Sequence, residues 1–447
     1  MSDWKKVKIG DVCEIIKGAT GIASAEPGEY PLVVTAVERK TCSSFQFDCE
    51  AVCIPLVSSS GHGKKSLNNV HYQKGKFALG TILCAVVPNN PNELDARFLH
   101  QYLQFYKDKI LVPLMKGAAN VSLSMKDIAK VEIPLPSIEK QHELSELFVE
   151  TQKKYKELLE ESEKQKSYVK QLRQNILQEA IEGKLTEEWR KENPVVKGNP
   201  DFDAEALFEK IQEEKCHTDS ELLRNSKKKV RSLPEITEDE KPFEIPEGWK
   251  WVRLGEIIKD SPRNGYSPKA VDFETPIKTL KLGAVTYGIF DASEFKYINE
   301  EIPKDAHCWL KNGDILIERS NSIEYVGICA IYTGKDDEFM YPDLLMRFRT
   351  SDSLSKEYIH KVLVSPFNRQ YFMNNAKGSQ KTMPKINQET VSNTLISLPP
   401  LAEQREIVSR VEKLLANVTE LEKQITEREE MTKQLMQSIM KDAFREE

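Results

Sequence analysis

The stretch LPSIEKQ at residues 135–141 returns as LPPLAEQ at residues 398–404, and each copy opens a long segment with helical periodicity. The tripeptide Lys-Gln-Leu at residues 170–172 and 433–435 matches at the same offset of 263 residues, so neither segment carries an insertion relative to the other. Each segment follows prolines and has acidic residues in its first turns, which favours a helix start. The sequence therefore predicts two equivalent long helices.

Apolar residues at alternating spacings of four and three in both segments predict the seam of a coiled coil. The predicted seam residues are Leu144, Phe148, Tyr155, Leu158, Val169, Leu172 and Ile176 in the first helix and Ile407, Val411, Leu414, Val418, Leu421, Ile425, Leu435 and Ile439 in the second. A helix of about 40 residues spans roughly 60 Å, which is too long for one small domain to cover. Each helix therefore needs a partner, and the other helix is the most economical one. Periodicity alone allows the pair to run parallel or antiparallel.

The segments ahead of the two helices also form a repeat. Trp4 begins one copy and Trp249 the other, and the residue types that follow are matched at the same spacing. Further along, the offset drifts from 245 to 263 residues. A matched frame around a divergent middle is typical of two domains that read different targets, although two decayed copies of one inert domain would look similar.

These patterns predict mixed strands and helices in each globular segment, hence an α+β fold with a pseudo-two-fold repeat. We expect globular domains over residues 1–136 and 246–400 and helical regions over residues 137–192 and 401–447. The linker over residues 193–245 contains one amphipathic pattern at residues 203–216.

Charge and composition bound the class of protein. The net charge is −6, but the acidic excess lies on the helices and the linker: residues 1–140 hold 17 basic and 14 acidic side chains, and residues 246–402 hold 20 of each. This distribution permits DNA binding through local basic clusters. No apolar run approaches the roughly 18 residues of a membrane span, and the first residues are no signal peptide. We expect a soluble, cytoplasmic protein that does not contact a membrane.

Catalytic motifs are not found. An amino-methyltransferase would carry an Asn/Asp-Pro-Pro-aromatic loop, and a translocating motor would carry a GxxxxGK[ST] loop; the chain has neither. Asp314 and Glu318 lack the lysine that a metal-dependent nuclease pair would need nearby. The cysteines form no CxxC pair and the histidines no ligand cluster. We therefore predict no catalytic and no metal-binding residue.

Three short polar segments are candidates for DNA contact. Lysines neutralise phosphates, and arginine and the side-chain amides read guanine and adenine through paired hydrogen bonds. The candidate residues are Lys377, Ser379, Gln380 and Lys381 with their first-copy partners Lys116 and Asn120, then Arg319 with Asn321, and then Ser60, His62, Lys64 and Lys65. Ordinary solvated turns would have a similar composition.

Several motifs together resemble the specificity subunits of type I restriction-modification systems. They are Ile245-Pro246-Glu247-Gly248-Trp249 with Leu254-Gly255-Glu256-Ile257, then Gly183-Lys184-Leu185-Thr186 with Trp189 and Arg190, then Gly313-Asp314-Ile315-Leu316 with Arg319, Asn321 and Tyr341-Pro342-Asp343, and finally residues 398–404. Nearly the whole chain is covered in the family's order. The first copy departs from the pattern because it lacks the Pro-x-Gly before Trp4, and its counterpart of Arg319 and Asn321 is expected at residues 85–89.

The resemblance implies a non-catalytic DNA reader. Two target recognition domains would lie at opposite ends of an antiparallel helical spacer, and each would read one half of a bipartite double-stranded site. The spacer would set the gap between the half-sites and dock two methyltransferase subunits, which carry S-adenosylmethionine and modify adenine at N6. This chain itself would bind no cofactor. Motor-nuclease subunits would join to restrict unmodified DNA. A coiled-coil scaffold without DNA specificity and a self-sufficient DNA-modifying enzyme are the alternatives.

Overall fold

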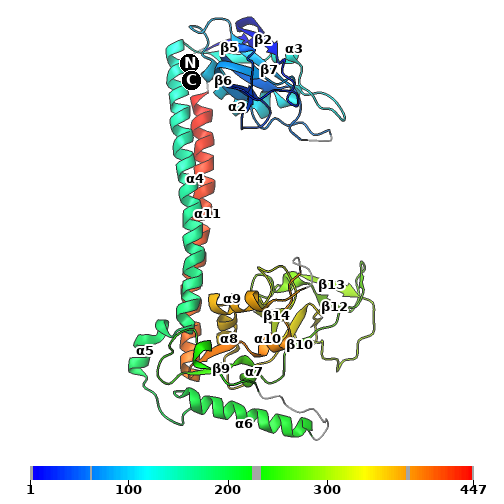
Figure 1. The fold of residues 1–447 in the computed structure, drawn as a ribbon, viewed down its shortest axis with the longest axis vertical. Helices are drawn as coiled ribbons and strands as arrows, with labels where there is room; N and C mark the ends of the chain where they lie inside the picture. The colour runs from blue at the N-terminus through cyan, green and yellow to red at the C-terminus, as the bar shows by residue number, and fades with distance from the viewer. Residues whose placement is uncertain (1–3, 61–62, 224–232, 379–382, 445–447) are drawn as a thin grey trace. The chain divides into compact units, whose positions relative to one another are not determined.

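A computed structural model describes residues 4–60, 63–223, 233–378 and 383–444 of the chain. Two globular domains of mixed helices and strands are combined with two long helices, α4 (Ile138–Ile181) and α11 (Leu401–Ala443) (Figure 1). The chain forms two compact units: unit 1 comprises residues 1–164 and 425–447, and unit 2 comprises residues 165–424. Each unit contains one globular domain and part of each long helix. The predicted α+β class is confirmed.

The first domain is built on a six-stranded sheet in the order β2-β7-β5-β6-β3-β4, in which only β3 and β6 pair in parallel. The ribbon β1-β8 leads into α4. Its elements are β1 (Lys5–Lys8), α1 (Ile9–Val12), β2 (Cys13–Lys17), β3 (Tyr30–Val33), β4 (Lys40–Cys42), β5 (Phe47–Pro55), β6 (His71–Leu79), β7 (Leu83–Pro88), α2 (Ala96–Ile110), the 3-10 turn η1 (Val112–Leu114), α3 (Met125–Ile128) and β8 (Glu132–Leu135).

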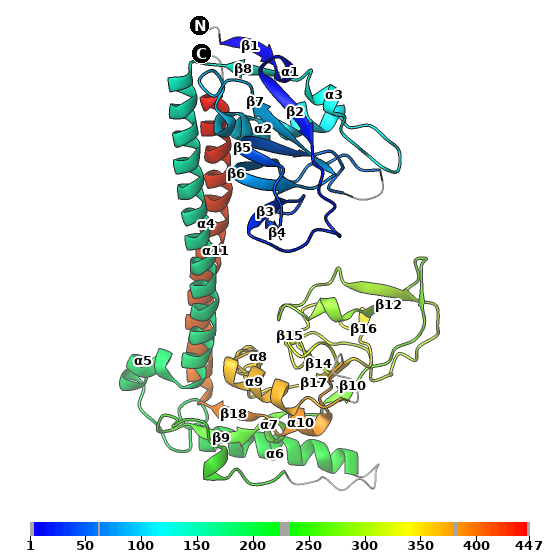
Figure 2. The same cartoon turned by 45° about the horizontal axis from the view of Figure 1, so that its top comes forward.

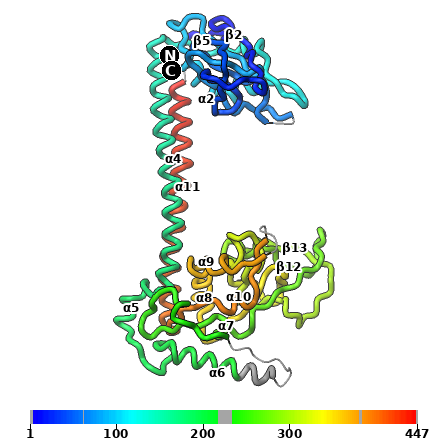
Figure 3. The backbone as a smooth tube through the Cα atoms, viewed as in Figure 1, coloured from blue at the N-terminus to red at the C-terminus, as the bar shows by residue number. Residues whose placement is uncertain are grey.

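The core of the first domain is completed by the end of α11. Phe98 and Leu103 of α2 are buried together with Phe148 of α4, Met440 and Phe444. The ring of Phe444 lies 6.1 Å from that of Phe98 and 6.4 Å from that of Phe148, measured between ring centroids. Figure 3 shows the end of the tube beside this domain. The last turn of the second helix is therefore part of the first domain's core.

The second domain repeats this architecture with shorter strands. The sheet β10-β17-β14-β15 matches β2-β7-β5-β6, the sheet β11-β13-β12-β16 contains the second hairpin, and β9-β18 is the ribbon that leads into α11. Its elements are β9 (Lys250–Arg253), α7 (Leu254–Ile257), β10 (Arg263–Asn264), β11 (Ala270–Val271), β12 (Ile277–Leu280), η4 (Leu282–Ala284), β13 (Phe295–Ile298), β14 (Ile315–Glu318), β15 (Cys329–Ile331), β16 (Phe339–Met340), β17 (Leu345–Phe348), α8 (Lys356–Leu363), α9 (Pro366–Asn375), α10 (Gln388–Ser392) and β18 (Leu395–Leu398).

The long helices pair in opposite directions in each unit (Figure 2). In unit 1 the start of α4 meets the end of α11, as the contact between Phe148 and Phe444 shows. In unit 2 the last part of α4 runs beside the first half of α11: the Arg173 guanidinium lies 3.0 Å from the Glu422 carboxylate, and Arg410 Nη1 donates to the carbonyl of Leu185, just after α4 (2.7 Å). The antiparallel orientation that the resemblance implied is confirmed.

The predicted heptad seam is only partly buried. Leu144, Phe148, Val169 and Ile176 of α4 and Ile407, Val411, Val418 and Ile425 of α11 are buried, and Tyr155, Leu414 and Ile439 are half-buried. The prediction is wrong for Leu158, Leu172, Leu421 and Leu435, which are 50%, 42%, 43% and 60% exposed. An α-helix has 3.6 residues per turn, so a strict repeat of 3.5 turns away from a straight partner by about 20° per heptad. The side chains next to the exposed leucines are the more buried ones at these positions: Leu159 is less exposed than Leu158, and Met436 is less exposed than Leu435.

A buried carboxylate joins three segments of unit 2. Glu403 of α11 is 1% exposed and accepts hydrogen bonds from Thr186 Oγ1 (2.6 Å), Arg190 Nη1 (2.6 Å) and Trp249 Nε1 (2.7 Å). A charge this deep in a protein is tolerated only when it is paired and hydrogen-bonded. Thr186 and Arg190 belong to η2 (Lys184–Thr186) and α5 (Glu187–Glu192), which follow α4, and Trp249 lies at the start of the second domain. The linker after α5 contains α6 (Ala204–Leu223) and η3 (Glu238–Glu240). Motifs that are distant in sequence thus meet at one carboxylate.

A glutamine fixes each globular domain to its helix. In unit 1 the buried Gln141 donates to the carbonyl of Pro136 (2.9 Å) and accepts from the backbone N–H of Asp95 (2.8 Å), the N-cap of α2. In unit 2 the buried Gln404 donates to the carbonyl of Pro399 (2.9 Å) and accepts from the backbone N–H of Ser355 (3.0 Å), the N-cap of α8. The repeated glutamine therefore makes the same clamp in both copies.

Candidate nucleic-acid interface

A basic loop closes at the end of β14 in the second domain. Lys377 and Lys385 exchange two backbone hydrogen bonds of 2.8 and 2.9 Å. Ser320, just after β14, bridges to Lys385, and the backbone N–H of Ile386 donates to the carbonyl of Arg319 (2.9 Å). The fold thus brings Arg319 beside the base of the loop.

Arg319 and Lys377, which were separate candidates in the sequence, line one cavity of about 480 Å³. Arg319 donates to the carbonyl of Asp343 (3.3 Å), which sets the direction of its guanidinium. The lining residues are Arg319, Tyr371, Asn375, Lys377, Lys385, Ile386, Asn387, Glu389, Thr390 and Asn393. Three cations, three amides and an aromatic ring against one carboxylate form a site suited to phosphate and to base edges.

Asn321, another predicted DNA contact, hydrogen-bonds a buried carboxyl group. Its side chain donates to Glu318 Oε2 (2.7 Å), and Thr286 donates to Glu318 Oε1 (2.6 Å). Burial raises the pKa of the Glu318 carboxyl, against the hydrogen bonds from Thr286 and Asn321, which lower it. Asn321 therefore holds a buried carboxyl in place, and the cavity that Arg319 lines does not include it.

The first domain has the same junction at the end of β5. Lys116 and Ser122 exchange two backbone hydrogen bonds of 2.8 Å around residues 117–121, Val57 bridges to Ser122, and the N–H of Leu123 donates to the carbonyl of Leu56 (2.9 Å). The exposed Asn120 lies in this loop. Lys116 Nζ also lies 3.0 Å from the Asp127 carboxylate, an exposed pair that water screens.

The serine and lysine loop of the first domain lies against that junction. Ser60 Oγ is 2.6 Å from Ser66 Oγ, and Ser58 Oγ donates to the carbonyl of Lys64 (2.6 Å), so side chains hold the loop closed. A methyl group on Gly63 would lie only 2.4 Å from the carbonyl oxygen of Ala118. Ser60 and the exposed Lys64 and Lys65 are therefore brought beside the loop that carries Lys116 and Asn120.

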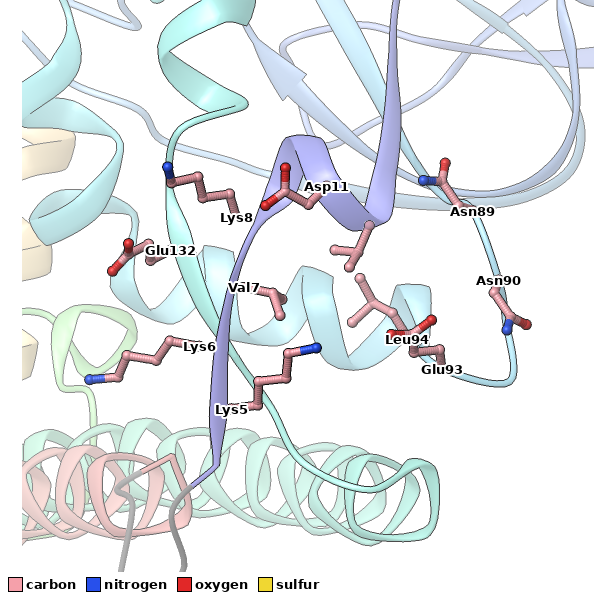
Figure 4. Close-up of a pocket in the computed structure, with 11 residues that line it drawn as sticks. Lys5, Lys6, Val7, Lys8, Asp11, Asn89, Asn90, Glu93, Leu94 and Glu132 are labelled. Atoms are coloured by element: carbon pink, nitrogen blue, oxygen red, sulfur yellow. The ribbon is translucent and has the colours of Figure 1, made fainter.

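The first-copy counterpart of Arg319 was predicted wrongly. The matching sheet orders and junctions place Leu56 at the position of Arg319 and Ser58 at that of Asn321. Asn89, in the predicted stretch, follows the C-terminal end of β7, whereas the junction at the end of β5 lies beside the N-terminal end of β7. Asn89 lines a different cavity, of about 410 Å³, together with Lys5, Lys8 and Asp11 (Figure 4). Arg319 and Leu56 are related by the same offset of 263 residues as the two long helices, and the predicted stretch at residues 85–89 lies outside that offset.

Four of the predicted site residues are not described by the structure, and two residues of the cavity were not predicted. His62, Ser379, Gln380 and Lys381 lie outside the residues that the structure describes. The sequence analysis did not name Lys385 and Asn387. Lys385 pairs with Lys377 in the same way as Ser122 pairs with Lys116 in the first domain. A lysine at each end of a glycine-containing loop was the available signal.

Residues 4–60, 63–223, 233–378 and 383–444 contain neither a membrane-spanning helix nor a metal-binding cluster. Every helix in these ranges is too short or too polar to span a bilayer. No group of three or more His, Cys, Asp or Glu side chains there is placed to hold a metal ion.

Comparisons with known proteins agree with this architecture. The family model described as "Type I restriction modification DNA specificity domain" matches residues 1–170 and again residues 246–430. The chain is 31% identical over 248 residues to the type I restriction enzyme EcoEI specificity subunit of Escherichia coli, covering 54% of this chain and 39% of that protein. It is 26% identical over 456 residues to the EcoDI specificity subunit of Escherichia coli, covering 100% and 88%.

Solved structures show the same fold. One is a chain from a structure concerned with complex assembly and conformational transition of the type I R-M system, with a TM-score of 0.62 and 18% identity, covering 99% of this chain and 97% of that one. Another is the HsdS subunit from Thermoanaerobacter tengcongensis, with a TM-score of 0.54 and 17% identity, covering 99% and 96%. With two matched domains on two long helices, the chain belongs to the family of type I restriction-modification specificity subunits.

Proposed function

We propose that each globular domain reads one half of a bipartite double-stranded DNA site, and that the chain itself catalyses no reaction. The observation that carries the proposal is the shared junction: in both domains a backbone pairing that begins at a lysine, Lys377 with Lys385 and Lys116 with Ser122, lies at the end of β14 or β5. The neighbouring residues differ, with Arg319 in one copy and Leu56 in the other. An arginine suits guanine and an aliphatic side chain suits a thymine methyl group, so the two half-sites should differ in sequence.

Two copies of one methyltransferase subunit would dock on the paired helices. The support is the set of exposed seam leucines, two in each unit: Leu158 and Leu435 in unit 1, and Leu172 and Leu421 in unit 2. Two pairs of exposed apolar side chains, one pair in each unit, suit two copies of one partner. In this proposal the partner binds S-adenosylmethionine and modifies adenine at N6, and motor-nuclease subunits join the complex to cut unmodified DNA.

The helices would set the gap between the half-sites. Deleting one matched heptad from both α4 and α11 removes about 10.5 Å of helix, which corresponds to about three base pairs at 3.4 Å each. The register of the pair is kept, because a whole heptad leaves the same faces in contact. Mapping methylated adenines in a host genome should then show both half-sites unchanged and a gap shorter by about three base pairs. An unchanged gap would refute the role as a ruler.

The DNA interface itself is tested by the salt dependence of binding. The complex with methyltransferase subunits should bind the mapped duplex with an affinity that falls steeply with salt. Replacing Lys377 and Lys385 by alanine should flatten the slope of log K against log salt by about 0.9 for each phosphate that is no longer neutralised. Lys210→Ala, an exposed lysine on α6, is the control and should leave the slope unchanged. If the double lysine variant and Lys210→Ala show the same salt dependence of binding, the cavity lined by Lys377 and Lys385 does not contact DNA.

The alternatives give different results in the same preparation. A protein scaffold would assemble with its partners and show no preference for a split site. A self-sufficient enzyme would transfer methyl groups or cut DNA as the purified chain alone, and that outcome would refute the proposal.

A further inference from the structure

The three most exposed large hydrophobic side chains among the described residues lie in equivalent loops of the two domains. Tyr287 and Ile289 are 83% and 77% exposed, and Val37 is 71% exposed. Residues 34–39 connect β3 to β4, and residues 281–294 connect β12 to β13. In both domains the first strand of this hairpin pairs antiparallel with the second and parallel with another strand of the domain. Two divergent domains thus keep an apolar tip at one position of the fold.

The tip of the second domain stands on a buried polar base. Thr286 donates to Glu318 (2.6 Å), which is fully buried, and the N–H of Gly288 donates to the carbonyl of Val285 (2.9 Å). Gly288 has φ +74°, so the turn between Tyr287 and Ile289 uses a conformation that favours glycine. The two exposed side chains are therefore held on a rigid turn.

The tip of the first domain is held by different chemistry with the same result. Arg39 Nη1 donates to the carbonyl of Val37 (3.0 Å), and its other nitrogens donate to Gln73 Oε1 (3.1 Å) and to the carbonyl of Tyr72 (3.3 Å). Arg39 Nη1 also lies 3.2 Å from Nδ1 of the buried His71. One arginine thus anchors the loop that exposes Val37.

Both tips lie at the end of the domain that carries the basic junction. Thr286 contacts the last residue of β14, and Arg319 is the next residue in the chain. Arg39 contacts the first residues of β6, directly after the connection that carries Lys64 and Lys65. Each tip loop therefore contacts a strand end that adjoins the connection carrying the basic residues.

We propose that these two tips are wedges that insert between base pairs of the DNA half-sites. An apolar side chain that enters a duplex unstacks a base step, and interactions with the bent DNA on either side offset that cost. A tip that is already rigid loses little conformational entropy on insertion. The phosphate-binding lysines beside it supply those interactions. The inference rests on the proposed reading of DNA and adds the element that distorts it.

The experiment uses the complex of the full chain with methyltransferase subunits and a duplex that carries the mapped site. Base steps other than the methylated adenine are replaced in turn by 2-aminopurine, whose fluorescence rises when it unstacks. Tyr287→Ser with Ile289→Ser disables the second tip, and Val37→Ser disables the first. Phe273→Ser is the matched control, because Phe273 is 57% exposed and precedes β12 at the opposite end of the same hairpin.

We expect the wild-type complex to raise the fluorescence in both half-sites. Each tip variant should lose the rise in one half-site only and should bind the duplex about tenfold more weakly, as the loss of one buried apolar side chain predicts. Phe273→Ser should behave as the wild type, and the urea midpoints of all variants should agree because the replaced side chains are on the surface.

Three results would overturn the wedge. The tip variants could keep wild-type fluorescence and affinity, or they could bind the duplex weakly while retaining the full rise, so that the tips only touch a groove. They could also lose the methyltransferase subunits on size-exclusion chromatography, so that the tips dock a protein. A wild-type complex that ignores the split site is a different failure, since it refutes the proposed function itself.

Discussion

Replacing Glu403 by alanine should destabilise unit 2 by about 3 kcal/mol. The carboxylate is 1% exposed and accepts three hydrogen bonds, from Thr186, Arg190 and Trp249. Removing one partner of a buried ion pair costs about 3–5 kcal/mol, because the other charge is left unpaired. The side chain of Arg190 is 21% exposed, so water can solvate part of its freed charge. The expected value therefore lies at the lower end of that range.

Urea unfolding followed by tryptophan fluorescence measures this loss, since four of the five tryptophans belong to unit 2. The matched control is Lys140→Ala, because Lys140 occupies the same position of the repeated motif in the first copy. Lys140 is half-buried and forms an ion pair with Glu143 (2.8 Å) in which the two side chains are 42% and 67% exposed, so its loss should cost less than about 1 kcal/mol. Glu403→Gln keeps the shape and removes the charge, so its loss should fall between the two. Equal small losses in all three variants would refute the assignment of Glu403 as the joint of this unit.

Other substitutions test the remaining structural features. Gln141→Ala leaves the backbone groups that its amide contacts unpaired and should lower the free energy of unfolding by about 2 kcal/mol, measured in urea; a neutral result contradicts the clamp. Gly183→Ala should lower the free energy of unfolding more than Gly198→Ala, for which a loss of about 1 kcal/mol is expected. Both glycines have a positive φ, but only at Gly183 would the new methyl group lie within 4 Å of other atoms. Equal melting temperatures of the two variants would refute this close approach. Burial lowers the pKa of His360 from 6.5 to about 4, so the unfolded chain takes up the proton first and stability falls by about 3 kcal/mol as the pH drops through that window. His360→Gln should flatten this part of the curve of urea midpoint against pH, and an equally steep fall would exclude His360 as its cause.

The long helices could be predicted from the sequence in extent but not in detail. One uninterrupted offset and a heptad pattern were enough to place two equivalent helices. Orientation required the family resemblance, because a seam of apolar residues looks the same in both directions. The exposure of Leu158 and Leu435 could not be predicted either. It depends on how closely two nearly straight helices follow a strict heptad, which is a property of the pair.

The candidate interface was predictable as chemistry and not as geometry. Arg319 and Lys377 could be named from residue type, but only the pairing of Ser320 with Lys385 brings them to one cavity. The first-copy counterpart of Arg319 was missed although Leu56 lies at the same offset of 263 residues as the long helices, because the two residues differ in chemical type. The exposed tips at Val37 and Tyr287 gave no signal at all, since a single apolar residue in a loop is usual.

Phe444 sets an order of events during synthesis of the protein. A nascent chain usually folds its N-terminal domain first. Here the ring that completes the packing around Phe98 is translated after the entire second domain. The core of the first domain therefore stays incomplete, with apolar side chains exposed, until Phe444 has been made. Unit 2 can fold completely as soon as residue 424 has emerged from the ribosome. The domain made first is the one finished last.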